Sequence, residues 1–236
     1  MEATGYVTLN RQSGLMREMA VVANNLANAS TTGFRREGVV FSEFVVALDN
    51  DPSLSMAYAS GRNVDLGQAA ISQTGGTFDF AIQGEGFFLI ETPQGDRLTR
   101  AGSFTPSAEG EIVTSDGYRL LDAGGAPVFI PPDAKAVALA RDGTLSANGQ
   151  PIALIGLWQP ADRLGLQRQS GTMFSATDLE PVADGVVLQG MLEESNVEPV
   201  SEIARMIEVQ RAYELGQKFL DAEDERVRGV IQTLGR

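Results

Sequence analysis

The residue types in this chain restrict the chemistry that it can perform. Neither Cys nor His occurs in its 236 residues, which excludes thiol nucleophiles, imidazole bases and the zinc sites built from them. Adjacent carboxylates do occur, at Glu193-Glu194 and Asp224-Glu225, and paired carboxylates hydrolyse glycosides where they flank a sugar-binding cleft. Neighbouring acidic residues more commonly form a solvated surface. We therefore expect no catalytic residue, no cofactor, no cofactor-binding residue and no metal ligand.

The charge of the chain excludes two classes of partner. The formal net charge is −13 and the pI is near 4.4. Nucleic-acid binding depends on Lys and Arg side chains that replace counterions, and anionic membrane surfaces attract the same residues, so we expect neither partner. No run of about 18 apolar residues occurs, and we expect no direct membrane insertion. The N-terminal residues also lack the continuous apolar stretch of a cleavable signal peptide.

An amphipathic helix is predicted at the N-terminus, within residues 1–33. The side chains of Leu15, Met19, Val22 and Leu26 are spaced by four, three and four residues, which places them on one helix face. Three asparagines crowd its last turns, at positions 24, 25 and 28, although an Asn amide competes for backbone groups inside a helix. Gly33, which suits a positive φ, is expected to end the segment.

The middle of the chain has the pattern of a compact antiparallel β domain, predicted over residues 76–194. Apolar and polar or small residues alternate from Phe78 to Ile82, and short apolar runs recur after them. Turn-forming pairs such as Asp142-Gly143 and Asn148-Gly149 separate these runs. Residues 34–75, between the first helix and this domain, are expected to form an extended linker that contains one or two strands.

A second helix is predicted over residues 195–236 and has the clearest pattern in the chain. Positions spaced alternately three and four residues apart form the apolar seam of a coiled coil. They are Met206, Val209, Tyr213, Gly216, Leu220, Glu223, Val227, Val230 and Leu234. A second apolar row lies beside this seam and contains Ile203, Ile207, Leu215, Phe219 and Ile231.

These elements indicate an α+β fold. An antiparallel β-rich central domain is flanked by N- and C-terminal α-helices that pair as a coiled-coil-like stalk. Isolated amphipathic helices are marginal in water, so both helices must pack against something. If they pair with each other, the second apolar row of the C-terminal helix stays exposed and predicts lateral neighbours. The alternative is that each helix folds back onto the β domain as a core element.

Three blocks of the sequence resemble the flagellar rod and hook protein family. The N-terminal block is VVANNLANASTTGF, residues 21–34. The central block is AIQGEGFFLI followed by LTRAGSF, within residues 81–104, and the C-terminal block is SNVEPVSEIARMIEVQRAYELGQKFL, residues 195–220. The ending EDERVRGVI, residues 223–231, is most similar to the proximal rod proteins of this family. The resemblance therefore touches both ends and the middle of the chain.

The resemblance implies a non-enzymatic structural subunit of the proximal rod in the bacterial flagellar basal body. Its partners would be other proximal and distal rod proteins, copies of itself and the flagellar type III export apparatus, which would export it to the periplasmic rod without cleaving a signal peptide. The terminal helices would assemble into an axial drive shaft that transmits torque. Two alternatives are a distal rod protein of the same family and a periplasmic carbohydrate-binding β domain with helical oligomerisation arms.

The same resemblance and the helical pattern define a candidate assembly interface. In a packed tube of helices we expect Asn25 and Asn28 to hydrogen-bond a neighbouring backbone and so fix its register, with Gly33 turning the chain out to Phe34. Alternatively, both asparagines only cap their own helix. Tyr213 is either a packed seam residue or an anchor to a neighbouring subunit. The complete candidate set is Leu15, Met19, Val22, Asn25, Leu26, Asn28, Gly33, Phe34, Ile203, Met206, Ile207, Val209, Tyr213, Leu220, Val227, Val230 and Leu234.

Overall fold

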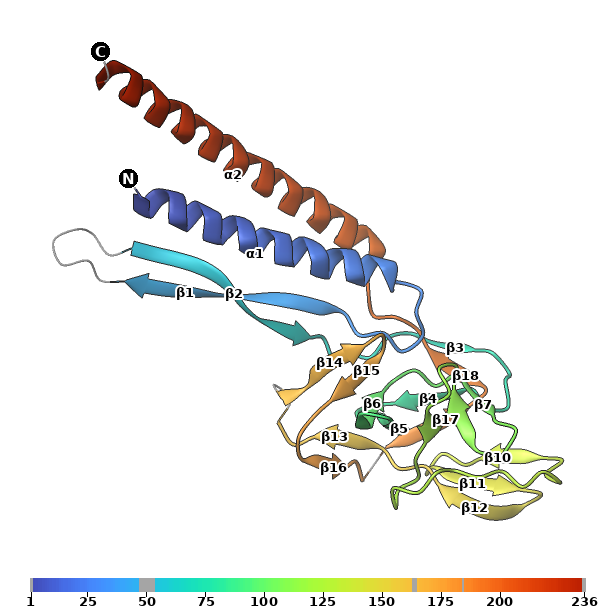
Figure 1. Cartoon of the computed structure of the whole chain (residues 1–236). Coiled ribbons are helices and arrows are strands. Elements are labelled where there is room, and N and C mark those ends of the chain that lie inside the picture. Colours follow the sequence, from blue (N-terminus) through green and yellow to red (C-terminus); the bar gives the residue numbers. More distant parts are fainter. Residues whose placement is uncertain (1, 47–53, 163–164, 184, 235–236) are drawn as a thin grey trace. The chain divides into compact units, whose positions relative to one another are not determined.

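The chain divides into two compact units, which are described separately. The computed structural model describes residues 2–46, 54–162, 165–183 and 185–234; side chains are described from residue 7 to residue 233, outside these gaps and outside 43–60. Unit 1 contains Met1–Ala27, Glu37–Asp65 and Val197–Arg236, and unit 2 contains Asn28–Arg36 and Leu66–Asn196. Figure 1 shows the elements of both units along the chain.

Two long helices form the helical part of unit 1. They are α1 (Glu2–Ala27) and α2 (Pro199–Leu234). α2 begins at a proline, whose missing N–H is no loss at a helix start. α1 ends earlier than the predicted limit at residue 33, because Thr31 N–H donates to the carbonyl of Asn28 and closes a turn there. Among the described residues, neither helix is both long and apolar enough to cross a membrane.

A β-hairpin completes unit 1. Strands β1 (Glu37–Val46) and β2 (Leu54–Val64) pair antiparallel, with Glu37 opposite Val64 and a bulge between Val40 and Phe41. Both strands pack on α1. We expected segment 34–75 to be an extended linker with one or two strands. It contains this paired ribbon and a third strand, β3 (Ile71–Gln73), which belongs to unit 2. The pairing of the ribbon follows from the support of α1, because an isolated two-stranded hairpin is marginal in water.

Unit 2 is built from short antiparallel strands, as predicted for the middle of the chain. Among the described residues these are β3 (Ile71–Gln73), β4 (Phe80–Gln83), β5 (Phe88–Thr92), β6 (Gly95–Thr99), β7 (Phe104–Pro106), β8 (Ile112–Thr114), β9 (Arg119–Leu120), β10 (Val137–Leu139), β11 (Thr144–Ala147), β12 (Gln150–Leu154), β13 (Trp158–Pro160), β14 (Gln167–Ser170), β15 (Met173–Ser175), β16 (Leu179–Pro181), β17 (Val186–Gln189) and β18 (Met191–Glu193). The largest sheet has the order β14-β15-β6-β5-β9-β8-β7. The two terminal helices and this β-rich middle confirm the α+β class.

The core of unit 2 follows from the apolar runs seen in the sequence. Phe80 and Ile82 of β4 are buried, as the alternation predicts, together with Phe88 of β5 and Phe104 of β7. The rings of Phe88 and Phe104 meet edge to face with centroids 5.5 Å apart, a favourable aromatic geometry. Strands β4, β5 and β7 therefore share one hydrophobic core.

The turn between β11 and β12 confirms one of the predicted turns. Ala147 pairs with Gln150, which leaves Asn148 and Gly149 as a two-residue loop. Their φ values are 50° and 80°. Positive φ at both positions is the requirement of a type I′ turn, which Asn-Gly meets with the least strain.

Candidate assembly surface

The two helices of unit 1 run antiparallel and contact each other through the predicted apolar faces (Figure 1). On α1, Val22 is buried, and Leu15, Met19 and Leu26 are half-buried. On α2, Val209 is buried, and Met206, Tyr213 and Leu220 are half-buried. The predicted seam therefore lies against α1 within the same chain over this part of α2.

Asn25 lies at the centre of a buried hydrogen-bond network in unit 1. Its side chain is fully buried, and its Nδ2 donates to the Glu37 carbonyl at 2.8 Å and to Glu202 Oε2 at 3.1 Å. The Glu37 N–H donates back to Asn25 Oδ1 at 3.0 Å. Asn25 thus joins α1 to the first residue of β1 and to the first turn of α2. These bonds align three elements of its own chain.

Two further polar contacts set the register of the helix pair. Arg205 Nε donates to Glu18 Oε1 at 2.7 Å, and this hydrogen bond raises the pKa of Arg205 above its ordinary value. Gln12 Nε2 donates to the Tyr213 carbonyl at 3.0 Å. Gly216 leaves room for Gln12, because a Cβ on Gly216 would lie 2.7 Å from Gln12 Nε2. A sliding of one helix along the other would break these contacts together.

Within the described residues of unit 1, the offset between the helices leaves the end of α2 without a facing helix. Asn25 faces Glu202 and Gln12 faces Tyr213, whereas α1 has 26 residues and α2 has 36. The last turns of α2 therefore pass the start of α1, as Figure 1 shows. Val227 and Val230, two of the predicted interface residues, lie on these turns and are exposed. The side chain of Leu234, a third, lies outside the described residues.

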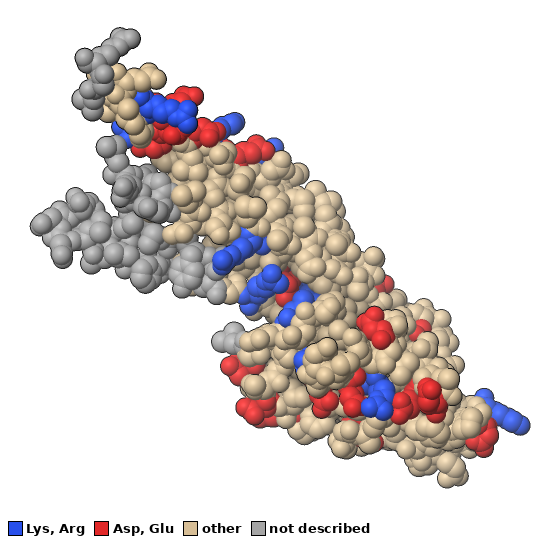
Figure 2. Space-filling view, in the orientation of Figure 1, with Lys and Arg blue, Asp and Glu red and all other residues tan. Residues whose placement is uncertain are grey.

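A row of apolar side chains on α2 faces solvent in the isolated chain. Its members are Ile203, Ile207, Leu215, Phe219 and Ile231, with exposed fractions of 45–67%. This is the second apolar row that the sequence analysis expected to stay exposed. In Figure 2 the surface over the middle of the two helices is largely uncharged, and charged side chains gather towards the C-terminal end of α2.

A cavity of about 410 Å³ opens between the helices beside this row. Leu15 and Gln12 of α1 line it from one side, and Leu215, Gly216 and Phe219 of α2 line it from the other. An apolar depression next to exposed apolar side chains suits the insertion of a side chain from another helix.

The remaining candidate residues belong to unit 2. Asn28 closes the turn after α1, since its Oδ1 accepts a hydrogen bond from Thr31 Oγ1 at 3.1 Å. Gly33 has φ of 68°, the positive value that was expected of it. Phe34 is fully buried, with the Arg168 guanidinium 4.2 Å from its ring centroid. The contact of Asn28 agrees with the local alternative, in which it serves its own helix end.

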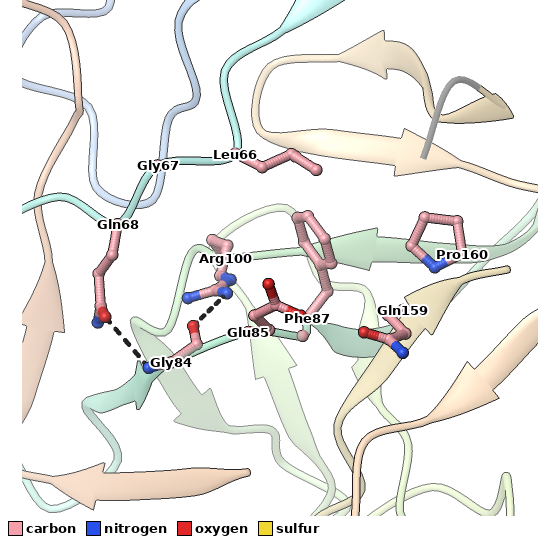
Figure 3. Close-up of a pocket in the computed structure, with 10 residues that line it drawn as sticks. Leu66, Gly67, Gln68, Gly84, Glu85, Phe87, Arg100, Gln159 and Pro160 are labelled. Carbon is pink, nitrogen blue, oxygen red and sulfur yellow. Dashed lines mark hydrogen bonds between the residues drawn. The ribbon is translucent and has the colours of Figure 1, made fainter. Parts of the chain in front are cut away.

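Unit 2 also holds a cavity of about 400 Å³ (Figure 3). Gly84 N–H donates to Gln68 Oε1 at 3.1 Å, and its carbonyl accepts from Arg100 at 2.7 Å. Of the described residues that line it, Glu85 is the one carboxylate. Glycoside hydrolysis needs a pair of carboxylates, so this lining does not supply the general acid–base couple that a hydrolase would use.

Comparisons with known proteins agree with the arrangement of two terminal helices around a β-rich middle. The chain matches the family descriptions "Flagella basal body rod protein" over residues 6–35, "Flagellar hook protein FlgE/F/G D1 domain" over 81–147 and "Flagellar basal body rod FlgEFG protein C-terminal" over 188–233. It is 37% identical to flagellar basal-body rod protein FlgF of Caulobacter vibrioides and 38% identical to FlgF of Mesorhizobium japonicum, over 100% of this chain and 99% of each relative. The chain belongs to the FlgF family of flagellar basal-body rod proteins.

Membership of the FlgF family makes the chain a structural subunit of the rod in the flagellar basal body, where it assembles with other rod components. Rod protein FlgG of Bacillus subtilis is also similar, at 31% identity over 96% of this chain and 97% of the relative. These relatives do not favour the carbohydrate-binding alternative.

The polar residues that join α1 to α2 in this FlgF-family chain were not predicted from the sequence. Glu18 and Arg205 join α1 to α2, and Glu202 receives the Asn25 amide. A signal was present, because Leu15, Glu18, Val22 and Asn25 are spaced by three, four and three residues. A carboxylate on an apolar helix face requires a partner, and this pattern could have directed the search to an arginine on the other helix.

Proposed function

We propose that the chain is a subunit of the proximal rod that polymerises with copies of itself and with other rod proteins through its terminal helices, forming an axial shaft that transmits torque. The observation that carries this proposal is the exposed apolar row on α2, Ile203, Ile207, Leu215, Phe219 and Ile231. In the proposal, α1 and α2 form a coiled-coil-like stalk within each subunit, and the exposed row contacts helices of neighbouring subunits.

Burial of this row contributes a favourable free energy to assembly. Fully burying a Leu, Ile or Phe side chain contributes about 1.5–3 kcal/mol. The row is already half covered, so each member gains about 1 kcal/mol on full burial. Summed over the five members, this gives roughly 5 kcal/mol per subunit when neighbouring subunits cover all of them, and a polymer repeats these contacts along its length.

The proposal divides the candidate interface residues of unit 1 whose side chains are described into two groups. Buried or half-buried residues, Leu15, Met19, Val22, Asn25, Leu26, Met206, Val209, Tyr213 and Leu220, hold the helix pair of one subunit together. Exposed residues, Ile203, Ile207, Val227 and Val230, contact neighbouring subunits. A rigid pair that presents a fixed apolar row is a suitable element of a shaft, because torque passes through packed side chains only if they keep their positions.

We also propose that the chain has no enzymatic activity and reaches the rod through the flagellar type III export apparatus without cleavage. The absence of Cys and His from the sequence supports the first point, and the family resemblance supports the second. Intact-mass spectrometry of the subunit from purified basal bodies tests the second point. A measured mass that corresponds to a chain starting at Met1 or at Glu2 supports it. A mass that corresponds to a chain from which a longer N-terminal segment has been removed contradicts it.

The test of the assembly proposal replaces two members of the exposed row. Leu215→Asp combined with Phe219→Asp adds two charges where the proposal requires apolar contact, and these side chains are 67% and 45% exposed, so the subunit itself should still fold. We expect loss of swarming motility and of complete rods in electron micrographs of basal bodies, with wild-type circular dichroism of the purified subunit. Leu154→Asp is the matched control, because Leu154 is 47% exposed and lies on β12 of unit 2. Normal rods in the double variant would refute the proposal.

A further inference from the structure

The segment Asn28–Arg36 is packed as a short peptide within unit 2. It belongs to unit 2 together with Leu66–Asn196, whereas the residues on both sides of it, Met1–Ala27 and Glu37–Asp65, belong to unit 1. Its side chains and backbone therefore meet a surface made by residues distant in sequence. Three consecutive positions, Gly33, Phe34 and Arg35, each meet a separate feature of that surface.

Gly33 fits where no other residue fits. Its φ is 68°, and a Cβ there would lie 2.3 Å from the backbone of Arg100 and Ala101. Its N–H donates to the Glu193 carbonyl at 2.8 Å. Both the positive φ and the backbone contact select glycine at this position.

Phe34 packs against a cation that also contacts a second aromatic residue. The Arg168 guanidinium lies 4.2 Å from the Phe34 ring centroid and 4.6 Å from that of Phe174. Arg168 also donates hydrogen bonds to the carbonyls of Arg35 and Gly171. An aromatic side chain at position 34 gains the cation–π contact, and an aliphatic one does not.

Arg35 fits a buried carboxylate. Arg35 and Glu193 are both fully buried, and Arg35 Nη2 donates to Glu193 Oε1 at 2.8 Å. Arg35 Nη1 also donates to the Gly67 carbonyl at 2.9 Å. Arg100 Nη1 donates to Glu193 Oε2 at 3.0 Å, so Glu193 remains paired with one arginine when Arg35 leaves. Burial lowers the pKa of Arg100 to about 10, which leaves it charged at neutral pH.

The backbone after Arg35 is also bound. Asn196 Oδ1 accepts from the Arg36 N–H at 2.6 Å, and the Asn196 N–H donates to the Phe34 carbonyl at 3.3 Å. Backbone bonds of this kind hold a peptide in place, and side-chain pockets decide which peptide is held.

We propose that unit 2 carries a peptide-recognition site for a Gly-Phe-Arg sequence, whose ligand is this chain's own segment around Gly33, Phe34 and Arg35, and that this segment docks and undocks as a separable peptide. Glu193, Arg100, Arg168 and Phe174 form the site without contribution from the segment. The site is occupied in the structure because the tether keeps its ligand at high effective concentration.

The test vacates the site in the full-length chain and supplies the ligand separately. Gly33→Val places a side chain against the Arg100 backbone and leaves the site residues unchanged. A fluorescent peptide of residues 30–37, STTGFRRE, is then titrated by anisotropy. We expect saturable binding to the Gly33→Val chain that is at least about tenfold tighter than binding of the same peptide with Arg35→Ala.

Gly38→Val is the matched control, because a Cβ at Gly38 meets nothing within 4 Å. Its own segment stays docked, and it should bind the peptide at least about tenfold more weakly than the Gly33→Val chain. Equal binding of the two peptides, or equal binding by the two variants, would overturn the proposal. Should Gly33→Val fail to fold, hydrogen exchange on the wild-type chain decides: amides of residues 28–36 that exchange faster than those of β5 and β6 support the proposal, and equal rates overturn it.

Discussion

Replacing Asn25 with Leu tests whether the buried amide aligns α1, β1 and α2. Leu is close to Asn in shape but cannot donate or accept a hydrogen bond. The variant loses the bonds to the Glu37 carbonyl, the Glu37 N–H and Glu202 Oε2. All the groups involved are buried, so their partners cannot turn to water.

The magnitude follows from these three groups. A buried group left without its partner costs about 1–3 kcal/mol, which gives about 3–6 kcal/mol for the network after the partial relaxation of its neighbours. Leu has a higher helix propensity than Asn, so the substitution also stabilises α1 by about 0.5 kcal/mol. For a chain of this length each kcal/mol lowers the Tm by roughly 2–4 °C. The net loss of about 2.5–5.5 kcal/mol therefore lowers the Tm of unit 1 by about 5–22 °C in Asn25→Leu.

Two signals separate the units in this experiment. Circular dichroism at 222 nm follows α1 and α2 of unit 1, and fluorescence of the single tryptophan, Trp158 of β13, follows unit 2. The lower Tm should appear in the circular dichroism at 222 nm. Asn10→Leu, at an exposed position of α1, is the control and should change stability by less than about 0.5 kcal/mol. If Asn25→Leu has the same Tm as Asn10→Leu, the hydrogen-bond network does not align these three elements.

Two further substitutions test charged contacts, one in each unit. Glu193→Gln removes the carboxylate that pairs with Arg35 and Arg100, and the loss of one partner from a buried ion pair costs about 3–5 kcal/mol. The midpoint of urea unfolding, followed by Trp158 fluorescence, should therefore move to a lower urea concentration. Glu194→Gln, at an exposed neighbouring position, is the control and should leave this midpoint unchanged. Arg205→Ala removes the partner of Glu18, but Arg205 is 48% exposed and the pair is screened by water, so the helical transition should lose only about 1–2 kcal/mol, and less at high salt. An Arg205→Ala loss that does not change with salt would show that packing of the arginine stem, and not its charge, stabilises the helices.

Most of the fold was predicted from the local spacing of apolar residues along the chain. The spacing of Leu15, Met19 and Val22 predicted the buried face of α1, and the seam from Met206 to Leu220 predicted the face of α2. The Asn148-Gly149 pair predicted a turn between two apolar runs, and the structure has a turn there with positive φ at both residues. These features depend on residues that are close in sequence, where helix and strand periods determine which side chains share a face.

Contacts between distant segments were not predictable in this way. Arg35 and Glu193 are 158 residues apart, and neither lies in a pattern that identifies the other. Asn25 was expected to serve a neighbouring chain, whereas its described partners, Glu37 and Glu202, belong to its own. The exposure of the second apolar row of α2 was predicted, because the seam packs on α1 and leaves Ile203 and Ile231 uncovered. Its role as an assembly surface stays a prediction.

The pairing of α1 with α2 has a consequence for the order in which the protein is made. Gln12 and Tyr213 are 201 residues apart. The first helix to be synthesised therefore cannot pair with the second until almost the whole chain has been made. Until α2 is complete, α1 can pack on β1 and β2, but the Asn25 amide lacks its hydrogen bond to Glu202 and the side of α1 that packs on α2 stays uncovered within unit 1. The long intervening loop adds little to the equilibrium cost of closure, which grows only as the logarithm of its length. The delay therefore affects when the helix pair forms far more than how stable it is, and a nascent chain that stops before residue 199 cannot form it.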